Sequence, residues 1–163
     1  MAHYFITGAS SGIGAALAGQ LTAAGHQVSA VARRQQRLAA LSKQLDAFHG
    51  YVADVGDAAS LATAIGTAKA KSGAIDVAIL NAGIYQPQDG TKIDPQIYAN
   101  HMTINYLGVV NALAGLVPVM VRDGKGHIAI VSSVAGWRGL PKSAAYGPTK
   151  AALISLAESL YFD

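Results

Sequence analysis

Two side chains near residue 150 have the types and spacing for acid–base chemistry. Tyr146 and Lys150 are four residues apart, so a helix would place them on one face, about 6 Å apart along its axis. A phenol titrates at about pH 10, and a nearby ammonium group stabilises the phenolate. The pair could therefore exchange a proton with an alcohol or carbonyl oxygen, and Ser133 could bind the same oxygen. Taken alone, Tyr146 and Lys150 could equally lie on an ordinary surface helix.

A glycine-rich segment near residue 10 has the pattern of a phosphate-binding turn. It follows the apolar run Tyr4–Thr7, precedes a helical pattern, and contains Gly8, Ser10, Ser11, Gly12, Ile13 and Gly14. A strand that enters such a turn before a helix presents free backbone N–H groups and the positive end of the helix dipole, which favour a pyrophosphate. The segment therefore predicts a dinucleotide site, and the alternative is a plain tight turn between a strand and a helix.

The next predicted strand indicates which dinucleotide binds. Such sites place the adenosine ribose near the end of the second strand, which here reads Ala32-Arg33-Arg34. A small residue followed by arginine leaves space and positive charge for a 2′-phosphate, whereas an acidic residue would bind a 2′-hydroxyl. We therefore predict that Arg33 contacts NADP(H), with NAD(H) as the other possible cofactor. The alternative is that both arginines are solvated or cap a neighbouring helix.

These residues need a scaffold of alternating strands and helices. Short apolar runs predict strands over residues 4–7, 27–32, 48–53, 77–80 and 127–132, and helical spacing predicts helices over 15–24, 36–46, 58–72 and about 95–122. This alternation implies parallel strands joined by right-handed crossovers, hence a doubly wound α/β sheet. We predict a Rossmann-type sheet with the strand order 3-2-1-4-5. The apolar strand at 127–132 should be covered on both faces, but in that order it lies at an edge of the sheet with unpaired backbone groups. We therefore expect that either something pairs with this strand or the chain is incomplete.

Composition limits the other classes of function. The 163 residues are 52% hydrophobic and 13% charged, and they are predicted to form one NAD(P)-binding domain, 1–163. The net charge is +3 and the basic residues are mostly scattered, so no nucleic-acid partner is predicted. The chain has no cysteine for a thiolate site, and we predict no metal. No signal peptide is visible and polar residues interrupt the apolar stretch 104–121, so we expect a cytoplasmic protein without a membrane span.

Five motifs in order resemble those of the short-chain dehydrogenase/reductase (SDR) family. They are the glycine turn Thr7–Gly14, the pair Asp54-Val55, the triplet Asn81-Ala82-Gly83, a serine at Ser133, and the YxxxK motif of Tyr146 and Lys150. The resemblance extends from residue 3 to the end of the chain. It implies an oxidoreductase that transfers a hydride between a nicotinamide cofactor and a small carbonyl or secondary alcohol substrate.

The resemblance also implies catalytic roles for individual residues. Tyr146 would be the general acid/base, Lys150 would stabilise its phenolate and hold the nicotinamide ribose, and Ser133 would orient the substrate carbonyl. Asn105 would support a water-mediated proton relay to Lys150. The alternative for Asn105 is a polar residue that is hydrogen-bonded within a buried helix.

Further residues would bind the cofactor or the substrate. Asp54 would meet the adenine, and Asn81 would fix the central strand beside the cofactor. Their neighbours Val55, Ala82 and Gly83 belong to the same predicted cofactor site. The substrate pocket would be lined by residues 84–86 and 134–140, while the identity of the substrate cannot be read from these residues.

The chain is shorter than is usual for this family. Members continue beyond the Tyr-Lys helix with a sixth strand, a mobile loop and helix over the substrate, and a seventh strand, so we expect a C-terminally truncated chain. The alternative function is therefore a dinucleotide-binding or interaction module without catalysis. The helix around 97–122 is apolar around much of its circumference, and together with the helix at 143–163 it would form the contact of a homodimer or homotetramer.

Overall fold

The computed structural model describes residues 1–162. The last residue of the predicted domain 1–163 and of the predicted interface helix 143–163 lies outside the described residues. Strands and helices alternate along most of this length. The elements are β1 (His3–Thr7), α1 (Gly12–Ala23), β2 (Gln27–Ala32), α2 (Gln35–Gln44), β3 (Phe48–Val52), α3 (Ala58–Ser72), β4 (Val77–Leu80), α4 (Pro95–His101), the π-helical η1 (Met102–Leu107), α5 (Gly108–Asp123), β5 (His127–Ile130), the short 3₁₀ helix η2 (Val134–Gly136) and α6 (Gly147–Leu160).

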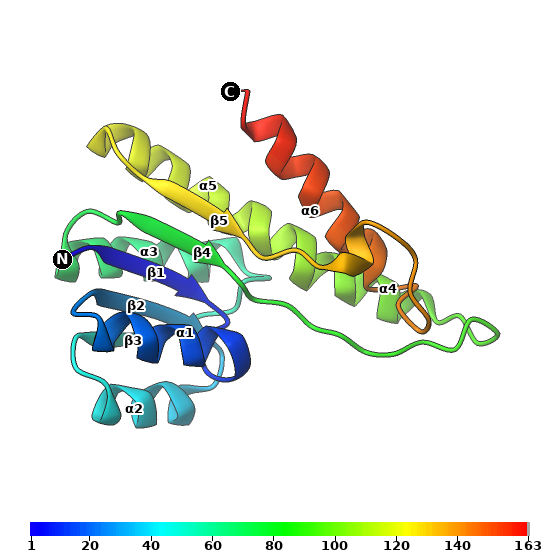
Figure 1. Cartoon of the computed structure of the whole chain (residues 1–163), viewed down its shortest axis with the longest axis horizontal. Coiled ribbons are helices and arrows are strands. Elements are labelled where there is room, and N and C mark those ends of the chain that lie inside the picture. Colours follow the sequence, from blue (N-terminus) through cyan, green and yellow to red (C-terminus); the bar gives the residue numbers. More distant parts are fainter. Residues whose placement is uncertain (163) are drawn as a thin grey trace.

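The five strands form one parallel sheet in the order β3-β2-β1-β4-β5, which confirms the predicted topology (Figure 1). The central strand β1 pairs with β2 and β4, so that Phe5 lies opposite both Ser29 and Ala78. The predicted strand ends differ slightly, since β3 stops one residue early and β5 stops at Ile130. The sheet thereby gathers the carboxyl ends of all its strands at one edge of the fold.

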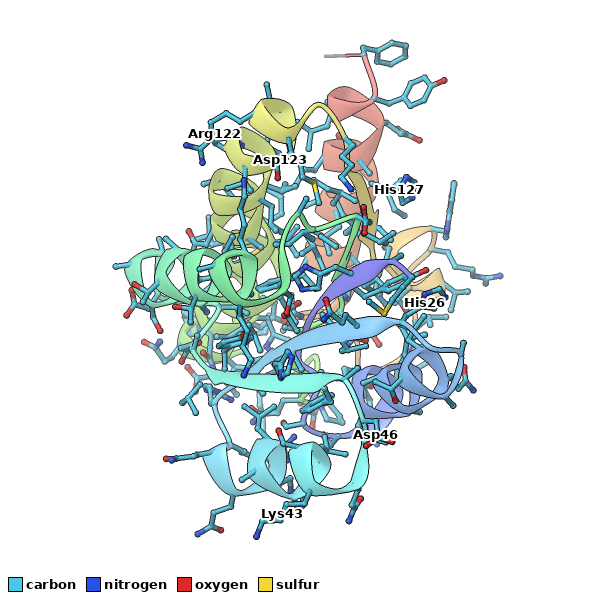
Figure 2. All side chains as sticks on the ribbon, turned by 90° about the vertical axis from the view of Figure 1, so that its left-hand side faces the viewer. His26, Lys43, Asp46, Arg122, Asp123 and His127 are labelled. Atoms are coloured by element: carbon cyan, nitrogen blue, oxygen red, sulfur yellow. The ribbon has the colours of Figure 1, made fainter. Side chains whose placement is uncertain are left out.

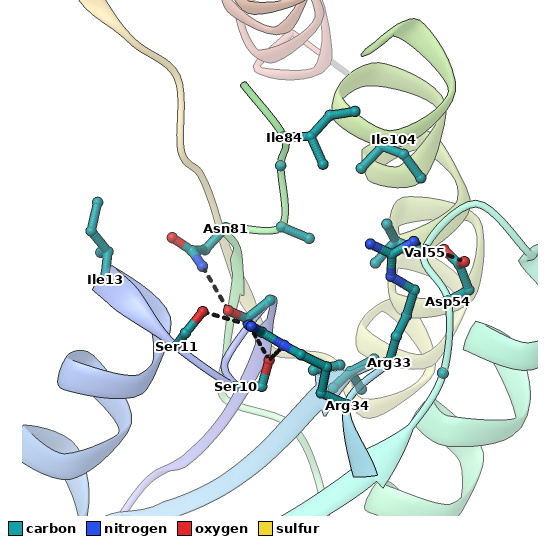
Figure 3. A pocket seen from close by; sticks show the side chains of 16 residues that line it. Ser10, Ser11, Ile13, Arg33, Arg34, Asp54, Val55, Asn81, Ile84 and Ile104 are labelled. Atoms are coloured by element: carbon teal, nitrogen blue, oxygen red, sulfur yellow. Dashed lines mark hydrogen bonds and ion pairs between the residues drawn. The ribbon is translucent and has the colours of Figure 1, made fainter. Parts of the chain in front are cut away.

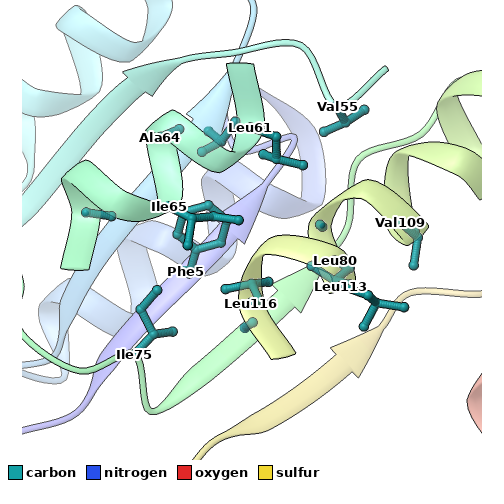
Figure 4. Packing of buried hydrophobic residues seen from close by; sticks show 14 of the residues in the cluster. Phe5, Val55, Leu61, Ala64, Ile65, Ile75, Leu80, Val109, Leu113 and Leu116 are labelled. Atoms are coloured by element: carbon teal, nitrogen blue, oxygen red, sulfur yellow. The ribbon is translucent and has the colours of Figure 1, made fainter. Parts of the chain in front are cut away.

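Helices cover both faces of the sheet, with α1 and α2 on one side and α3 and α5 on the other (Figures 1 and 2). On the α3/α5 side, Phe5 of β1 packs with Ile65 and Leu116 (Figure 4). On the other side, Ile6 and Val28 pack with Leu38 of α2. Successive residues of a strand point to opposite faces, so the neighbours Phe5 and Ile6 each enter a different half of the core.

The first helix begins where two glycines allow a tight turn after β1. Gly8 has a φ of +72°, and a Cβ atom there would lie 2.7 Å from the Cα of Ala82 at the end of β4. A Cβ on Gly14 would lie 2.7 Å from the carbonyl oxygen of Gly8. A larger residue at either position would push α1 away from the strand ends, which explains why both sites require glycine.

The long apolar helix predicted over about 95–122 is interrupted. Asp94 starts α4 by accepting a hydrogen bond from the N–H of Gln96 (2.9 Å), but residues 102–107 then adopt the wider π-helical turn before α5 begins. By length and composition the segment Pro95–Asp123 could cross a membrane, and 44% of its most apolar stretch is buried inside the fold. In this structure α5 packs against α3 and β4 as a core helix.

The edge strand β5 is less covered than its composition predicted. His127 is exposed, and Ile128, Ala129 and Ile130 are each only partly buried. Ile128 and Ile130 pack toward the α3/α5 cluster. Within residues 1–162, β4 is the only strand that pairs with β5. Within the described residues, the predicted cover of β5 is therefore only partial.

Candidate active site

A cleft of about 440 Å³ opens at the carboxyl ends of the strands (Figure 3). Many of the predicted cofactor-binding residues line it, namely Gly8, Ser10, Ser11, Ile13, Arg33, Asp54, Val55, Asn81, Ala82 and Gly83. Gly12 and Gly14 shape the turn beside it, while Tyr146 and Lys150 lie beyond its lining. The lining also contains Ala32 and Arg34, which flank the predicted contact Arg33, and Ile84, which was predicted for the substrate pocket. The sequence did not indicate three other lining residues, namely Val31, Ala53 and Ile104.

The start of α1 lies beside this cleft. The helix begins at Gly12, and Ser11 precedes it in extended conformation without capping the helix through its side chain. The first N–H groups of an α-helix have no partner within the helix, and they carry the positive end of its dipole. The turn therefore presents backbone donors to the same cleft that Ser10 and Ser11 line.

The two arginines after β2 have different partners (Figure 3). Arg33, which was the predicted contact, is largely exposed and lies 3.7 Å from Asp54 between Nη1 and Oδ2. Arg34 instead reaches the glycine-rich turn, where its Nη2 donates to Ser10 Oγ (2.8 Å) and to Ser11 Oγ (2.5 Å) and its Nε donates to Ser10 Oγ (3.0 Å). Arg34 occupies the position before α2 without a side-chain bond to that helix, and the side-chain partner of Arg33 is Asp54.

Asn81 ties the ends of β1 and β4 together. Its Nδ2 donates to the carbonyl oxygen of Thr7 (3.1 Å), and its backbone N–H donates to Thr7 Oγ1 (3.0 Å). The N–H of Ala82 donates to the same hydroxyl (3.0 Å). On the other wall, Asp54 Oδ1 accepts the N–H of Gly56 (2.9 Å), so the carboxylate is held at the rim by its own loop as well as by Arg33.

Tyr146 and Lys150 come together at the start of α6. Tyr146 immediately precedes the helix, Pro148 occupies its first turn, and the Lys150 Nζ lies 5.6 Å from the centre of the Tyr146 ring. Lys150 is buried, and its Nζ donates to the carbonyl oxygen of Val131 (2.7 Å) just after β5. Burial lowers the pKa of Lys150 below its ordinary value, because removal from water penalises the ammonium form. The structure thus places a desolvated cation beside the phenol.

Ser133 lies on the short turn that packs against this helix start. Its Oγ accepts the N–H of Ala135 (3.2 Å) at the beginning of η2. A Cβ on Gly136, at the end of η2, would lie 2.8 Å from the carbonyl carbon of Lys150, so the two segments are in close contact. Both Ser133 and Tyr146 are among the described residues, and no hydrogen bond joins them in this structure.

Asn105 is fully buried within the π-helical turn η1. Its Oδ1 accepts the N–H of Ile84 (2.7 Å), and its Nδ2 donates to the carbonyl oxygen of Ile84 (3.0 Å) and to Thr149 Oγ1 (3.1 Å). These bonds agree with the alternative reading of a polar residue bonded inside the protein. They also join the end of β4 to α6, and a π-helical turn at such a position often accompanies a functional site.

Gly83 connects the nucleotide cleft with the Tyr-Lys pair. It lines the cleft, and a Cβ placed on it would lie 3.3 Å from Asn105 Oδ1 and 3.8 Å from Lys150 Nζ. A ligand that extends along the cleft past Gly83 would therefore arrive beside Lys150 and Tyr146. This arrangement suits an elongated dinucleotide whose reactive end must meet an acid–base group.

Comparison with known proteins identifies the family. The model of the short chain dehydrogenase family matches residues 2–163, so the chain belongs to that family, as its motifs predicted. It is 36% identical over 166 residues to 3-dehydrosphinganine reductase TSC10B of Arabidopsis thaliana, covering 97% of this chain and 49% of that protein. It is 35% identical over 163 residues to dehydrogenase/reductase SDR family protein 7-like of Drosophila melanogaster, covering 95% of this chain and 50% of that protein.

Solved structures show the same fold. The closed form of serine dehydrogenase complexed with NADP+ superimposes with a TM-score of 0.94 at 28% identity, covering 99% of this chain and 66% of that chain. The order of the sheet and the position of its helices are therefore those of the family. The chain spans about half the length of the two curated relatives.

Proposed function

We propose that this chain carries the cofactor-binding and proton-transfer parts of an NADP(H)-dependent oxidoreductase acting on a carbonyl or secondary alcohol. The observation that carries the proposal is the continuity at Gly83, where the nucleotide cleft meets Lys150 and Tyr146. Membership of the short-chain dehydrogenase family supports a reaction with NAD(P) at such a site.

The residues of the cleft suit a dinucleotide. Gly8 packs closely against the backbone of Ala82 and has no side chain that would project into the cleft. A pyrophosphate could therefore approach the backbone at the start of α1. Small residues at the end of β2 leave room for the adenosine, and Arg33 and Arg34 offer positive charge where a 2′-phosphate would lie. The similar serine dehydrogenase was solved with NADP+, which supports the same preference here.

Three side chains would serve the reaction once substrate is present. A bound nicotinamide would supply or accept the hydride at the substrate carbon. Tyr146 would give or take the proton at the substrate oxygen through its phenol oxygen, and Ser133 would donate a hydrogen bond to that oxygen. Lys150 lies 5.6 Å from the centre of the Tyr146 ring, and its positive charge would stabilise the phenolate formed when Tyr146 loses its proton.

We further propose that the chain associates with copies of itself through α5 and α6. Several apolar side chains of this region are exposed in the single chain, including Leu107 (47%) at the end of η1, Val117 (38%) and Val121 (73%) on α5, and Leu160 (42%) on α6. Isolated exposed apolar residues are ordinary, but a set along one helical segment favours a covered interface. Sedimentation velocity should give a dimer or tetramer, and a monomer at micromolar concentration would contradict this proposal.

Calorimetric titration with NADPH and NADH tests the cofactor part of the proposal. The chain should bind NADPH more tightly, and Arg34→Ala should weaken NADPH binding by about tenfold or more while changing NADH binding little, since a charge-assisted hydrogen bond contributes about 1.5–3 kcal/mol. Arg37→Ala, an exposed arginine on α2 outside the cleft lining, is the matched control, whereas Arg33→Ala should also weaken NADPH binding because Arg33 lines the cleft. Equal binding of NADPH and NADH would rule out the proposed preference.

Turnover tests the chemical part. Tyr146→Phe should abolish NADPH-dependent ketone reduction and leave nucleotide binding nearly unchanged, because the phenol oxygen is removed while the ring stays. A chain that binds nucleotide but reduces no ketone would favour the alternative of a binding or interaction module. Activity that survives in Tyr146→Phe would remove Tyr146 from the proposed role.

A further inference from the structure

In the segment 84–88, which follows β4, every second residue is hydrogen-bonded through its backbone to another part of the fold. Both backbone groups of Ile84 bond to Asn105, at 2.7 Å and 3.0 Å. Two residues later, the N–H of Gln86 donates to His101 Nε2 (3.1 Å), and the N–H of Gln88 donates to the carbonyl oxygen of Lys142 (3.0 Å). The segment therefore runs beside the loop that precedes α6 (Figure 1).

The groups that hold this segment are themselves fixed. Asn105 is fully buried and also donates to Thr149 Oγ1 on α6 (3.1 Å). His101 is fully buried too, and its Nδ1 bonds to the carbonyl oxygen of Ile97 (2.7 Å) one turn earlier in α4. Buried and fully bonded anchors keep a single arrangement, so the backbone between Ile84 and Gln86 has little freedom to move.

Tyr85 lies between these two anchors and meets the proposed catalytic phenol. The ring centres of Tyr85 and Tyr146 are 5.1 Å apart, and their planes cross at 66° in an edge-to-face arrangement. About half of Tyr85 (52%) remains exposed, so the ring also offers surface to a ligand. A molecule whose oxygen reaches Tyr146 can therefore pack a substituent against the exposed surface of the Tyr85 ring.

We propose that Tyr85 determines substrate specificity, by providing a fixed aromatic wall that selects carbonyl compounds carrying a flat, unsaturated substituent such as an aryl group. A planar ring can pack against Tyr85 in an offset or edge-to-face geometry, whereas a puckered saturated ring of the same carbon number makes poorer contact. Two side chains of the segment 134–140, which was predicted to line the substrate pocket, are also apolar and exposed, namely Val134 (70%) and Trp137 (76%). The inference rests on the proposed oxidoreductase function.

The test compares acetophenone with cyclohexyl methyl ketone, which have the same number of carbon atoms but differ in the flatness of the ring. Dissociation constants are measured by ligand-observed NMR with NADP+ present, because the oxidised cofactor cannot reduce a ketone and the readout is binding alone. Acetophenone should bind about three- to tenfold more tightly to the unmodified chain. Tyr85→Leu should remove this preference, and Tyr85→Phe, which keeps the ring, should retain it.

Each other outcome decides against the inference. Equal affinity for the two ketones, a preference that survives in Tyr85→Leu, or no binding of either ketone would overturn the role of Tyr85. The half-exposed position of Tyr85 means that neither variant should impair folding, which circular dichroism would check. Binding of NADP+ is measured in the same sample and tests the proposed function. Failure to bind NADP+ would refute that function, whereas the relative affinities of the two ketones test the role of Tyr85.

Discussion

Replacement of Asn105 by alanine should destabilise the protein more than any ordinary polar truncation in the same helical segment. The Asn105 side chain is fully buried and makes three hydrogen bonds, two to the backbone of Ile84 and one to Thr149 Oγ1. Alanine would leave the N–H and the carbonyl oxygen of Ile84 without these partners. It would also separate the end of β4 from α6.

The expected magnitude follows from these lost bonds. Each buried polar group left without a partner costs about 1–3 kcal/mol, and Ile84 is only partly buried, so water can relieve some of this cost. We therefore expect the free energy of unfolding to fall by about 2–4 kcal/mol. With an unfolding entropy of about 2.1 cal/mol/K per residue, a chain of 163 residues should melt about 6–12 °C lower.

Asn111→Ala is the matched control, because Asn111 lies on the adjoining helix and makes a single bond, from Nδ2 to the carbonyl oxygen of Val55 (2.9 Å). Its loss should cost about 1 kcal/mol. Thermal and urea unfolding followed by circular dichroism measure the two variants, and amide hydrogen exchange should show faster exchange at Ile84 in Asn105→Ala alone. The reasoning is wrong if Asn105→Ala melts no lower than Asn111→Ala, or if exchange at Ile84 is unchanged.

Two further outcomes follow from buried groups elsewhere. Burial lowers the pKa of His3, whose Nε2 bonds to Ser29 Oγ (2.8 Å), so the unfolded chain takes up its proton first and stability should fall as the pH drops below about 6.5. Urea unfolding at pH 7.5 and 5.5 should show a smaller loss in His3→Gln, and an equal loss would contradict this origin. Gly14→Ala should destabilise the chain by about 2 kcal/mol or more and weaken NADPH binding, because its Cβ would lie 2.7 Å from the oxygen of Gly8. Gly66→Ala in α3 meets open space and should instead stabilise the protein by about 0.5–1 kcal/mol, so similar melting temperatures for the two variants would refute the steric argument.

Much of the fold was readable from local patterns. Apolar runs at strand length alternate with helical periodicity, and this alternation restricts the chain to parallel strands with right-handed crossovers. The observed order β3-β2-β1-β4-β5 satisfies that restriction, which other doubly wound strand orders would satisfy too. Glycine spacing also predicted the turn before α1, because the steric demand at Gly8 and Gly14 leaves few other residue types that fit.

The interruption of the long helix could not be read in the same way. Residues 95–122 keep an apolar periodicity throughout, yet the structure contains the π-helical turn Met102–Leu107. Within this π-helical turn, the buried side chain of Asn105 is hydrogen-bonded to the backbone of Ile84 and to the hydroxyl of Thr149. Those partners are distant in sequence, so no local pattern around Asn105 records them.

The candidate site shows the same division. By itself the sequence determined which residue types are available for chemistry and which of them lie close along the chain, as with Tyr146 just before α6 and Lys150 within that helix. Only the tertiary structure decided that Arg34 rather than Arg33 bonds the glycine-rich turn, and that Tyr85 packs against Tyr146. The physical reason is the sequence distance over which each effect acts. Periodicity and steric limits act between residues that are close in sequence, whereas contacts between strand ends depend on how the whole sheet assembles.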